Sequence, residues 1–377
     1  MENKHLVTLR VLSKKLVAAL LMTSAVSTSV RAGGMDAYQQ RTDDSSGQLT
    51  SSNPVYMPSQ WSMSNGEVLR GFIRPANGIS VAASANVRWG IFGAVSGQIS
   101  LGNGSTVNLE CDLDLTSSAS LAIGGSSIHK ATIASPQPVA IHLGGDFSLP
   151  ASRTLFIDSP ELTLDGRGYT LNFANSSAAL RINSDKMLTL RNMVINGLSG
   201  ANQIKGPGTL KLQNCVVNIP TDTTWTTSWG DVRILMADDV VVRGGGKYVF
   251  GSATSLTVSA NSILSFDTNT TFSFAPQDQS NNRLYMGDST SILRFDGATF
   301  CAPGVGGFTG LQMRKGMLML DNKVTVSNGY HHTLENAITL GDGTDAGEVD
   351  VHLNAGASFN MNCGILHYNN ANFGGYG

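Results

Sequence analysis

From about Glu67 onward, apolar residues alternate with polar ones in short runs, and Asp, Asn or Gly closes each run. Alternation with a period of two is typical of half-buried β-strands. One recurrent phrase is an apolar–x–apolar pair, then Asp or Asn within one or two residues, then a second apolar stretch. It opens at Leu162, Leu188, Leu210, Leu264, Leu293 and Leu318. A second phrase, apolar–x–apolar–Gly, opens at Ile99, Leu121, Ile141, Leu284 and Ile338.

These phrases return every 20 to 29 residues, apart from one interval of 54 residues that holds a degenerate copy, DVVVRGGGKYVF from Asp239. A period of this size indicates stacked repeats. One repeat cannot bury its own apolar side, whereas stacking buries a continuous interior and pairs each backbone with the next. The pattern predicts an all-β fold: a single-stranded right-handed parallel β-helix (β-solenoid) of roughly twelve coils, at about 24 residues per coil. A β-sandwich or propeller is the main alternative, because even strand spacing permits it.

Asp, Asn and Gly stand where the chain has to turn between strands. Gly, and to a lesser extent Asn and Asp, adopt positive φ at low cost. We therefore expect the repeated Asp and Asn to lie at bends and, in stacked coils, to form ladders of side chains.

LTLDGRGYTLNF from Leu162 and LTLRNMVINGL from Leu188 resemble coils of the pectin-lyase-like right-handed β-helix superfamily. The resemblance covers about residues 155–330 well and the rest loosely. It implies the fold and no particular activity, because that superfamily includes polysaccharide lyases and hydrolases, phage tailspikes, adhesins and autotransporter passengers.

The composition agrees with short strands and tight turns. Of 377 residues, 42 are Gly and only 14% are charged, against about 25% in a typical domain. Gly, Ser, Thr and Asn weaken helices, because they lose more backbone entropy or compete for backbone hydrogen bonds.

The first 32 residues are typical of a signal peptide. Lys14 and Lys15 precede an apolar stretch of about eleven residues, and small residues before position 33 suit cleavage after Ala32. An uncleaved anchor is the alternative. We expect a polar lead-in or cap over 33–66, the solenoid over 67–362 and a soft tail over 363–377. No later apolar run would insert in a membrane, so the predicted location is secreted, extracytoplasmic or at the cell surface.

The formal charge is −2, and without residues 1–32 it is −6, from 20 basic and 26 acidic residues. This sign predicts no binding to nucleic acid or anionic lipid. It also predicts poor binding of a polyanionic glycan unless metal ions bridge the charges.

Four cysteines lie far apart in the sequence: Cys111, Cys215, Cys301 and Cys363. Their spacing matches no zinc or redox motif. In a solenoid they would lie several coils apart, so we expect buried free thiols rather than disulfides.

Asp238 and Asp239 are weak candidates for a catalytic acid–base pair, by similarity to paired aspartates in glycoside hydrolases of this fold. The other motifs of those enzymes, an Asn-Thr-Asp upstream and His-Gly and Arg-Ile-Lys downstream, are missing. The alternative is a pair of turn acids before a strand at Val240–Val242.

Two segments carry residue types that bind metals. Asp342, Asp345, Glu348 and Asp350 stand among glycines, which suits calcium, although the spacing matches no known loop. His331, His332 and Glu335 follow a predicted turn, and adjacent histidines on a strand would face opposite ways. An acidic surface turn and a solvated loop are the respective alternatives, and no cofactor is expected with the possible exception of calcium.

Trp225 and Trp229 flank Thr-Thr-Ser and are candidate ligand-binding residues, because aromatic platforms stack against sugar rings or partner proteins. The alternative is a loop over the solenoid with both indoles half buried.

Three functions follow as hypotheses. The first is a non-enzymatic display or adhesion protein that binds a glycan or a surface protein. The second is a polysaccharide-cleaving enzyme whose carboxylates come from neighbouring coils. The third is self-assembly end to end through the open ends of the solenoid, which present unpaired strand edges.

Overall fold

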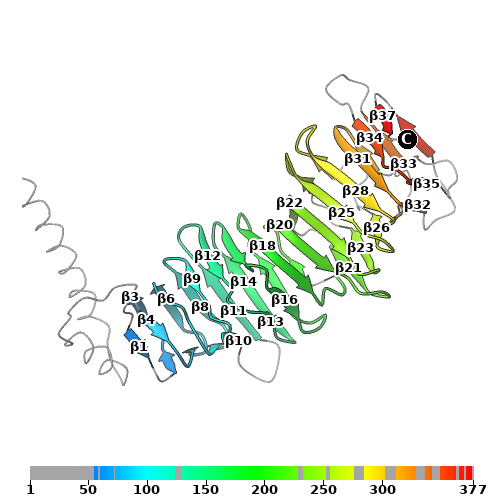
Figure 1. The fold of residues 1–377 in the computed structure, drawn as a ribbon. Coiled ribbons are helices and arrows are strands. Elements are labelled where there is room, and N and C mark those ends of the chain that lie inside the picture. Colours follow the sequence, from blue (N-terminus) through cyan, green and yellow to red (C-terminus); the bar gives the residue numbers. More distant parts are fainter. Residues whose placement is uncertain are drawn as a thin grey trace, which may run out of the picture.

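The computed structural model describes residues 55–57, 60–71, 73–123, 129–201, 203–227, 232–251, 255–275, 284–301, 311–327, 336–341, 349–361, 365–368 and 371–375. These residues form strands and no helix, and therefore no helix among them is long and apolar enough to cross a bilayer. The strands stack in chain order along an elongated body, with the two ends of the colour range at opposite ends (Figure 1).

The strands form three stacks, which we name face 1, face 2 and face 3 in the order in which the chain passes through them. The coil that begins with β12 (Val139–His142) continues with β13 (Phe147–Leu149) and β14 (Arg153–Asp158). The next coil repeats this order with β15 (Leu162–Asp165), β16 (Thr170–Phe173) and β17 (Ala179–Ile182). Each strand pairs in parallel with its counterpart one coil later.

The remaining strands extend these stacks in both directions. On face 1 they are β1 (Val55–Met57), β4 (Ile73–Pro75), β9 (Leu113–Asp114), β24 (Leu256–Val258), β27 (Leu284–Met286), β30 (Leu311–Met313), β33 (Asn336–Leu340) and β36 (Ile365–Tyr368). On face 2 they are β2 (Trp61–Met63), β5 (Ile79–Val81), β7 (Gln98–Leu101), β10 (Ser120–Ile123), β25 (Ile263–Phe266), β28 (Ile292–Asp296), β31 (Gly316–Asp321), β34 (Val349–Leu353) and β37 (Ala371–Gly375). On face 3 they are β3 (Val68–Gly71), β6 (Asn86–Ile91), β8 (Ser105–Leu109), β11 (His129–Ala134), β19 (Ile204–Lys205), β21 (Thr224–Thr227), β23 (Lys247–Phe250), β26 (Thr271–Phe274), β29 (Thr299–Cys301), β32 (Lys323–Ser327) and β35 (Ser358–Met361).

In the middle of the molecule one long strand crosses faces 1 and 2 in each coil: β18 (Met187–Asn196), β20 (Thr209–Asn218) and β22 (Arg233–Arg243). Each bends once, at Asn192, Asn214 and Asp238, where φ is 53°, 51° and 53°. The predicted placement of the repeated Asn and Asp at bends is confirmed here.

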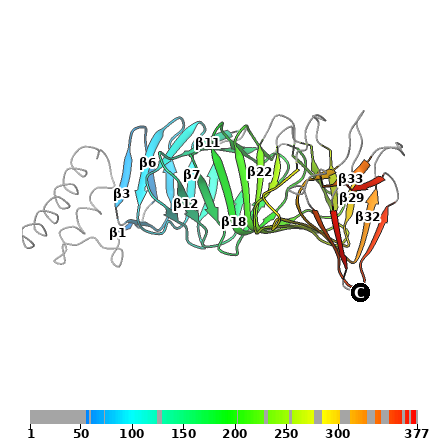
Figure 2. The same ribbon diagram turned by 90° about the horizontal axis from the view of Figure 1, so that it is seen from above.

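The expected all-β parallel solenoid is confirmed, with about ten turns against the roughly twelve expected. Figure 2 shows the same succession of coils from above. Parallel pairing also begins before residue 67, with β1 and β2, and continues after residue 362, with β36 and β37. The additional coils pair backbone groups that would otherwise lie at an open edge.

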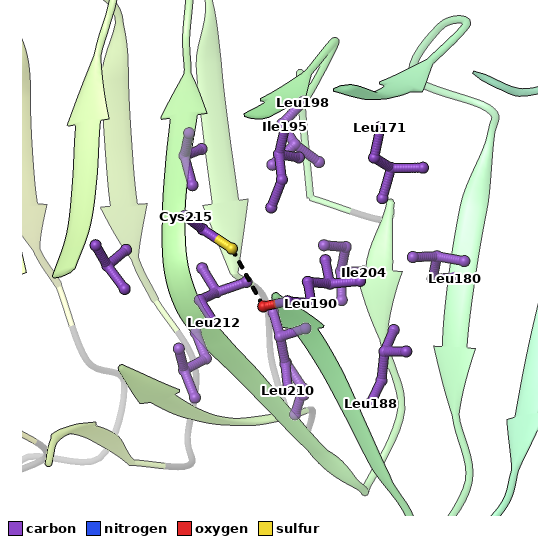
Figure 3. Close-up of a cluster of buried hydrophobic side chains, with 14 of the residues drawn as sticks. Leu171, Leu180, Leu188, Leu190, Ile195, Leu198, Ile204, Leu210, Leu212 and Cys215 are labelled. Atoms are coloured by element: carbon purple, nitrogen blue, oxygen red, sulfur yellow. Dashed lines mark hydrogen bonds between the residues drawn. The ribbon is translucent and has the colours of Figure 1, made fainter. Parts of the chain in front are cut away.

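The interior changes character along the axis. In the first half it is aliphatic, as the cluster around Leu190 and Leu212 shows (Figure 3), and it encloses a cavity of about 60 Å³ lined by apolar side chains. In the second half it is a column of rings. Phe266 stacks on Phe272 at 4.5 Å between centroids and on Phe295 at 5.6 Å. Both fillings remove large apolar areas from water, which is the main stabilising contribution in such a fold.

Candidate ligand-binding strip on face 2

Asp238 and Asp239 together form an irregularity in strand pairing. Gln213 pairs with Ala237 and Cys215 with Val240, so two aspartates on β22 oppose the single residue Asn214 on β20. This is the arrangement of a β-bulge. Asp238 Oδ2 accepts a hydrogen bond from Gln213 Nε2 at 2.9 Å, and both aspartates are exposed. The pair therefore has a local structural role at the bend.

Trp225 lies in the interior, where 1% of it is exposed and its ring stacks on Tyr248 with centroids 4.6 Å apart. Its indole is part of the aromatic column and is not available to an external ligand. Trp229, the second candidate, lies outside the described residues.

Most of the candidate metal ligands also lie outside the described residues: Asp342, Asp345, Glu348, His331, His332 and Glu335. Asp350 is on β34, in register with Met317. Among the residues that the structure describes, no three His, Cys, Asp or Glu side chains are grouped so that they could hold a metal ion.

Cys111, Cys215 and Cys301 are free thiols, as expected, and the last two are buried; Cys363 is not described. Cys215 Sγ donates a hydrogen bond to the carbonyl oxygen of Leu190 at 3.1 Å (Figure 3). Burial raises the pKa of the Cys215 thiol to about 11. The side chain acts as a small apolar residue.

The first polar ladder runs along the bend between faces 1 and 2. Asn214 Nδ2 donates to Asn192 Oδ1 at 2.9 Å, and Asp238 continues the row on the next coil. Asn192 Nδ2 also donates to Asp165 Oδ1 at 3.1 Å. Consecutive coils are thus joined by amide hydrogen bonds outside the backbone ladder.

A second ladder runs along the other edge of face 2. Asn218 Nδ2 donates to Asn196 Oδ1 at 2.8 Å, and Arg243 Nε donates to Asn218 Oδ1 at 2.8 Å. These residues end strands β18, β20 and β22. Their side chains occupy equivalent positions on three successive coils.

Between the two ladders lies a row of half-buried valines, Val194, Val216 and Val241. They alternate with residues of the core such as Val217 and Val242, and therefore point outward. Val194 pairs with Val216, and Val216 with Val241. We name the two ladders and the valines between them the face-2 strip.

The strip becomes acidic toward the C-terminal end. Asp267, Asp296 and Asp321 follow Arg243 at the same edge of successive coils. Arg294 donates from Nε to Asp321 Oδ2 at 2.5 Å and from Nη2 to Asp296 Oδ2 at 3.1 Å. One guanidinium therefore neutralises two of the three stacked carboxylates.

Asp267 differs from its neighbours in this acidic section. Burial, and then the charge of Asp296, raise the pKa of the Asp267 carboxyl above its ordinary value, while Arg294 and Arg243 offset part of the effect. Two adjacent carboxyls in different environments are the arrangement from which acid–base pairs are built.

A further charged group lies at the first edge of the strip. Asp165 accepts from Arg191 Nη2 at 2.8 Å and from the backbone N of Arg167 at 3.2 Å, and His142 Nδ1 lies 3.6 Å from it. Burial alone would raise the pKa of Asp165, but the hydrogen bonds from Arg191, Arg167 and Asn192 outweigh it and lower the pKa. Asp165 thus fastens three coils together as an anion.

Sequence reasoning did not single out the strip, although a signal for it was present. Asn192-Met-Val-Ile-Asn196 and Asn214-Cys-Val-Val-Asn218 share the spacing Asn-x-Val-x-Asn. In a strand this spacing places Asn, Val and Asn on one side. Recognising that the side is the outer one required the register.

No known protein family, curated protein or solved structure matches the chain.

Proposed function

We propose that this is a secreted or cell-surface protein whose face-2 strip binds an extended, uncharged glycan chain along the axis of the solenoid. The observation that carries the proposal is the pair of amide ladders on either side of an outward row of valines. We also propose, from the coil phrases and the parallel three-faced stack, that the chain belongs to the pectin-lyase-like superfamily.

The chemistry of the strip matches that of a sugar chain. An Asn amide offers both donors and an acceptor, and a sugar hydroxyl needs one of each. The valines offer apolar surface to the C–H faces of the sugar rings. Because the same set recurs on each coil, about 4.8 Å further along, a ligand with a regular repeat gains the same contacts several times.

A charge placed in the middle of the strip tests this. Val241→Lys puts an ammonium group between the ladders, and binding of a neutral glycan should weaken at least tenfold, because the charge must be desolvated on binding. The control is Leu235→Lys, the equivalent half-buried outward position of the same strand β22 on face 1.

Calorimetric titration of a panel of neutral oligosaccharides gives the affinities. The proposal predicts a loss for Val241→Lys alone, with both variants melting like the unmodified protein. Equal losses in the two variants, or no binding of any neutral glycan by the unmodified protein, would overturn it.

A second candidate function is cleavage of a polysaccharide at the acidic section, and the raised pKa of Asp267 beside Asp296 favours it. A carboxyl that keeps its proton near neutral pH can act as a general acid while its neighbour stays ionised. Chain-length analysis of neutral and acidic polysaccharides tests this function. Cleavage that Asp267→Asn abolishes would establish it, and intact chains across the panel would exclude these carboxyls as a catalytic pair.

A further inference from the structure

Basic side chains gather on face 3 in the first half of the solenoid, although the chain as a whole is acidic. Lys130 lies on β11, Arg181 on β17 and Lys205 on β19, around Phe156 of β14. Phe156 pairs in register with Arg181, and Arg181 with Lys205. Lys130 is two residues before the position opposite Phe156 on the neighbouring strand. The four side chains form one patch across four coils, which we name the face-3 patch.

The cations of the patch are available to a ligand. Lys130 and Arg181 are exposed and Lys205 is half buried, and within the described part of the chain none of them forms an ion pair. Asp158, the acid on β14, is instead paired with Lys186 at 3.7 Å.

The ring of Phe156 holds the two exposed cations in place. Lys130 Nζ and Arg181 Cζ each lie 5.9 Å from its centroid, within the range of a cation–π interaction. Side chains ordered in this way lose less entropy when a ligand binds. The patch is therefore organised before any partner arrives.

We infer that the face-3 patch binds a linear acidic glycan whose sugars carry carboxylates. A guanidinium forms paired hydrogen bonds with a carboxylate, and an ammonium attracts one as a point charge. The cations follow the axis at steps of one coil, about 4.8 Å, so a chain with regularly spaced carboxylates meets them in turn. The inference concerns a different face and a different ligand from the face-2 strip, and it stands without the proposed function.

Arg181→Glu tests the patch, because residue 181 points outward and its reversal leaves the core unchanged. The matched control is Lys211→Glu, which makes the same change of net charge on face 1. With polygalacturonate as the probe at low salt, we expect binding to weaken at least tenfold in Arg181→Glu and less than twofold in Lys211→Glu. The dependence of affinity on salt should become shallower only in Arg181→Glu.

Other polyanions complete the test. Equal weakening in both variants would mean that only net charge matters, and would overturn the inference. So would the absence of polygalacturonate binding, or binding of a sulfated glycan, poly-glutamate or single-stranded DNA at the same patch with equal or higher affinity. Lysine in place of glutamate at residue 181 should restore part of the affinity, since the charge returns without the planar fork.

Discussion

Asp238 occupies the same bend as Asn214 one coil earlier, with φ of 53° and 51°. Left-handed backbone costs an ordinary residue about 1–2 kcal/mol, and Asn and Asp bear it best among residues with a side chain. Asp239, the extra residue of the bulge, has no counterpart on β20. The two neighbouring aspartates therefore have different structural reasons to be there.

The difference predicts opposite results for two substitutions. Asp238→Asn should leave the free energy of unfolding unchanged or raise it slightly, because Asn suits this backbone and still accepts the hydrogen bond from Gln213. Asp238→Ala should lower the free energy of unfolding by about 1–2 kcal/mol, because Ala lacks both advantages. Chemical denaturation gives these values.

Asp239→Ala is the control, and its effect should stay within about 0.5 kcal/mol, as for other exposed positions. A large loss in Asp239→Ala with none in Asp238→Ala would contradict the assignment of the bend.

The repeating phrases were sufficient to predict the coils, because apolar alternation and its period depend on residues next to one another in sequence. The same is true of the bends: Asn192 and Asn214 follow an apolar pair, and both adopt positive φ as expected. Local rules were enough where local conformation decides.

Contacts between coils could not be predicted in the same way. Trp225 stands among threonines and resembles a surface residue in sequence, yet the alternation of β21 turns it inward, against Tyr248. The face-3 patch joins residues 24 to 26 positions apart, and the net charge of the chain conceals it. Both depend on register, which a slip of one residue would reverse.

Asp165 predicts an acid-sensitive contribution to stability. Its folded-state pKa is lowered, so its contribution is complete above the ordinary Asp pKa of about 3.9 and is lost as pH falls through the lower folded-state value. In Asp165→Asn this contribution is absent at every pH. The difference in free energy of unfolding between the two proteins should therefore shrink as pH falls below about 4.

Urea titrations between about pH 7 and 2 measure that difference. Asp158→Asn on the adjacent strand is the control, since its exposed pair with Lys186 at 3.7 Å contributes at most about 1 kcal/mol. A difference for Asp165→Asn that stays constant across the range would mean that its carboxylate is not bound as described.

Cys215 should resist alkylation in the folded protein. The thiolate is the reactive species, and with a pKa of about 11 few molecules carry it at pH 8. The sulfur is also buried, with 1% of the residue exposed. Mass spectrometry after iodoacetamide treatment should find Cys215 unmodified in native protein and modified in denaturant. Rapid labelling of native protein would place this thiol at the surface.

Trp225 should be among the residues whose truncation lowers stability most. Its indole is 1% exposed and stacks on Tyr248 with an interplanar angle of 25°. Trp225→Ala should lower the free energy of unfolding by about 3–5 kcal/mol, because it leaves a cavity at one end of the aromatic column. Trp225→Phe keeps an aromatic ring there and should lose much less. Denaturation of both variants separates this role from the ligand platform suggested by the sequence. A surface platform would lose glycan affinity without losing stability, and a core residue does the reverse.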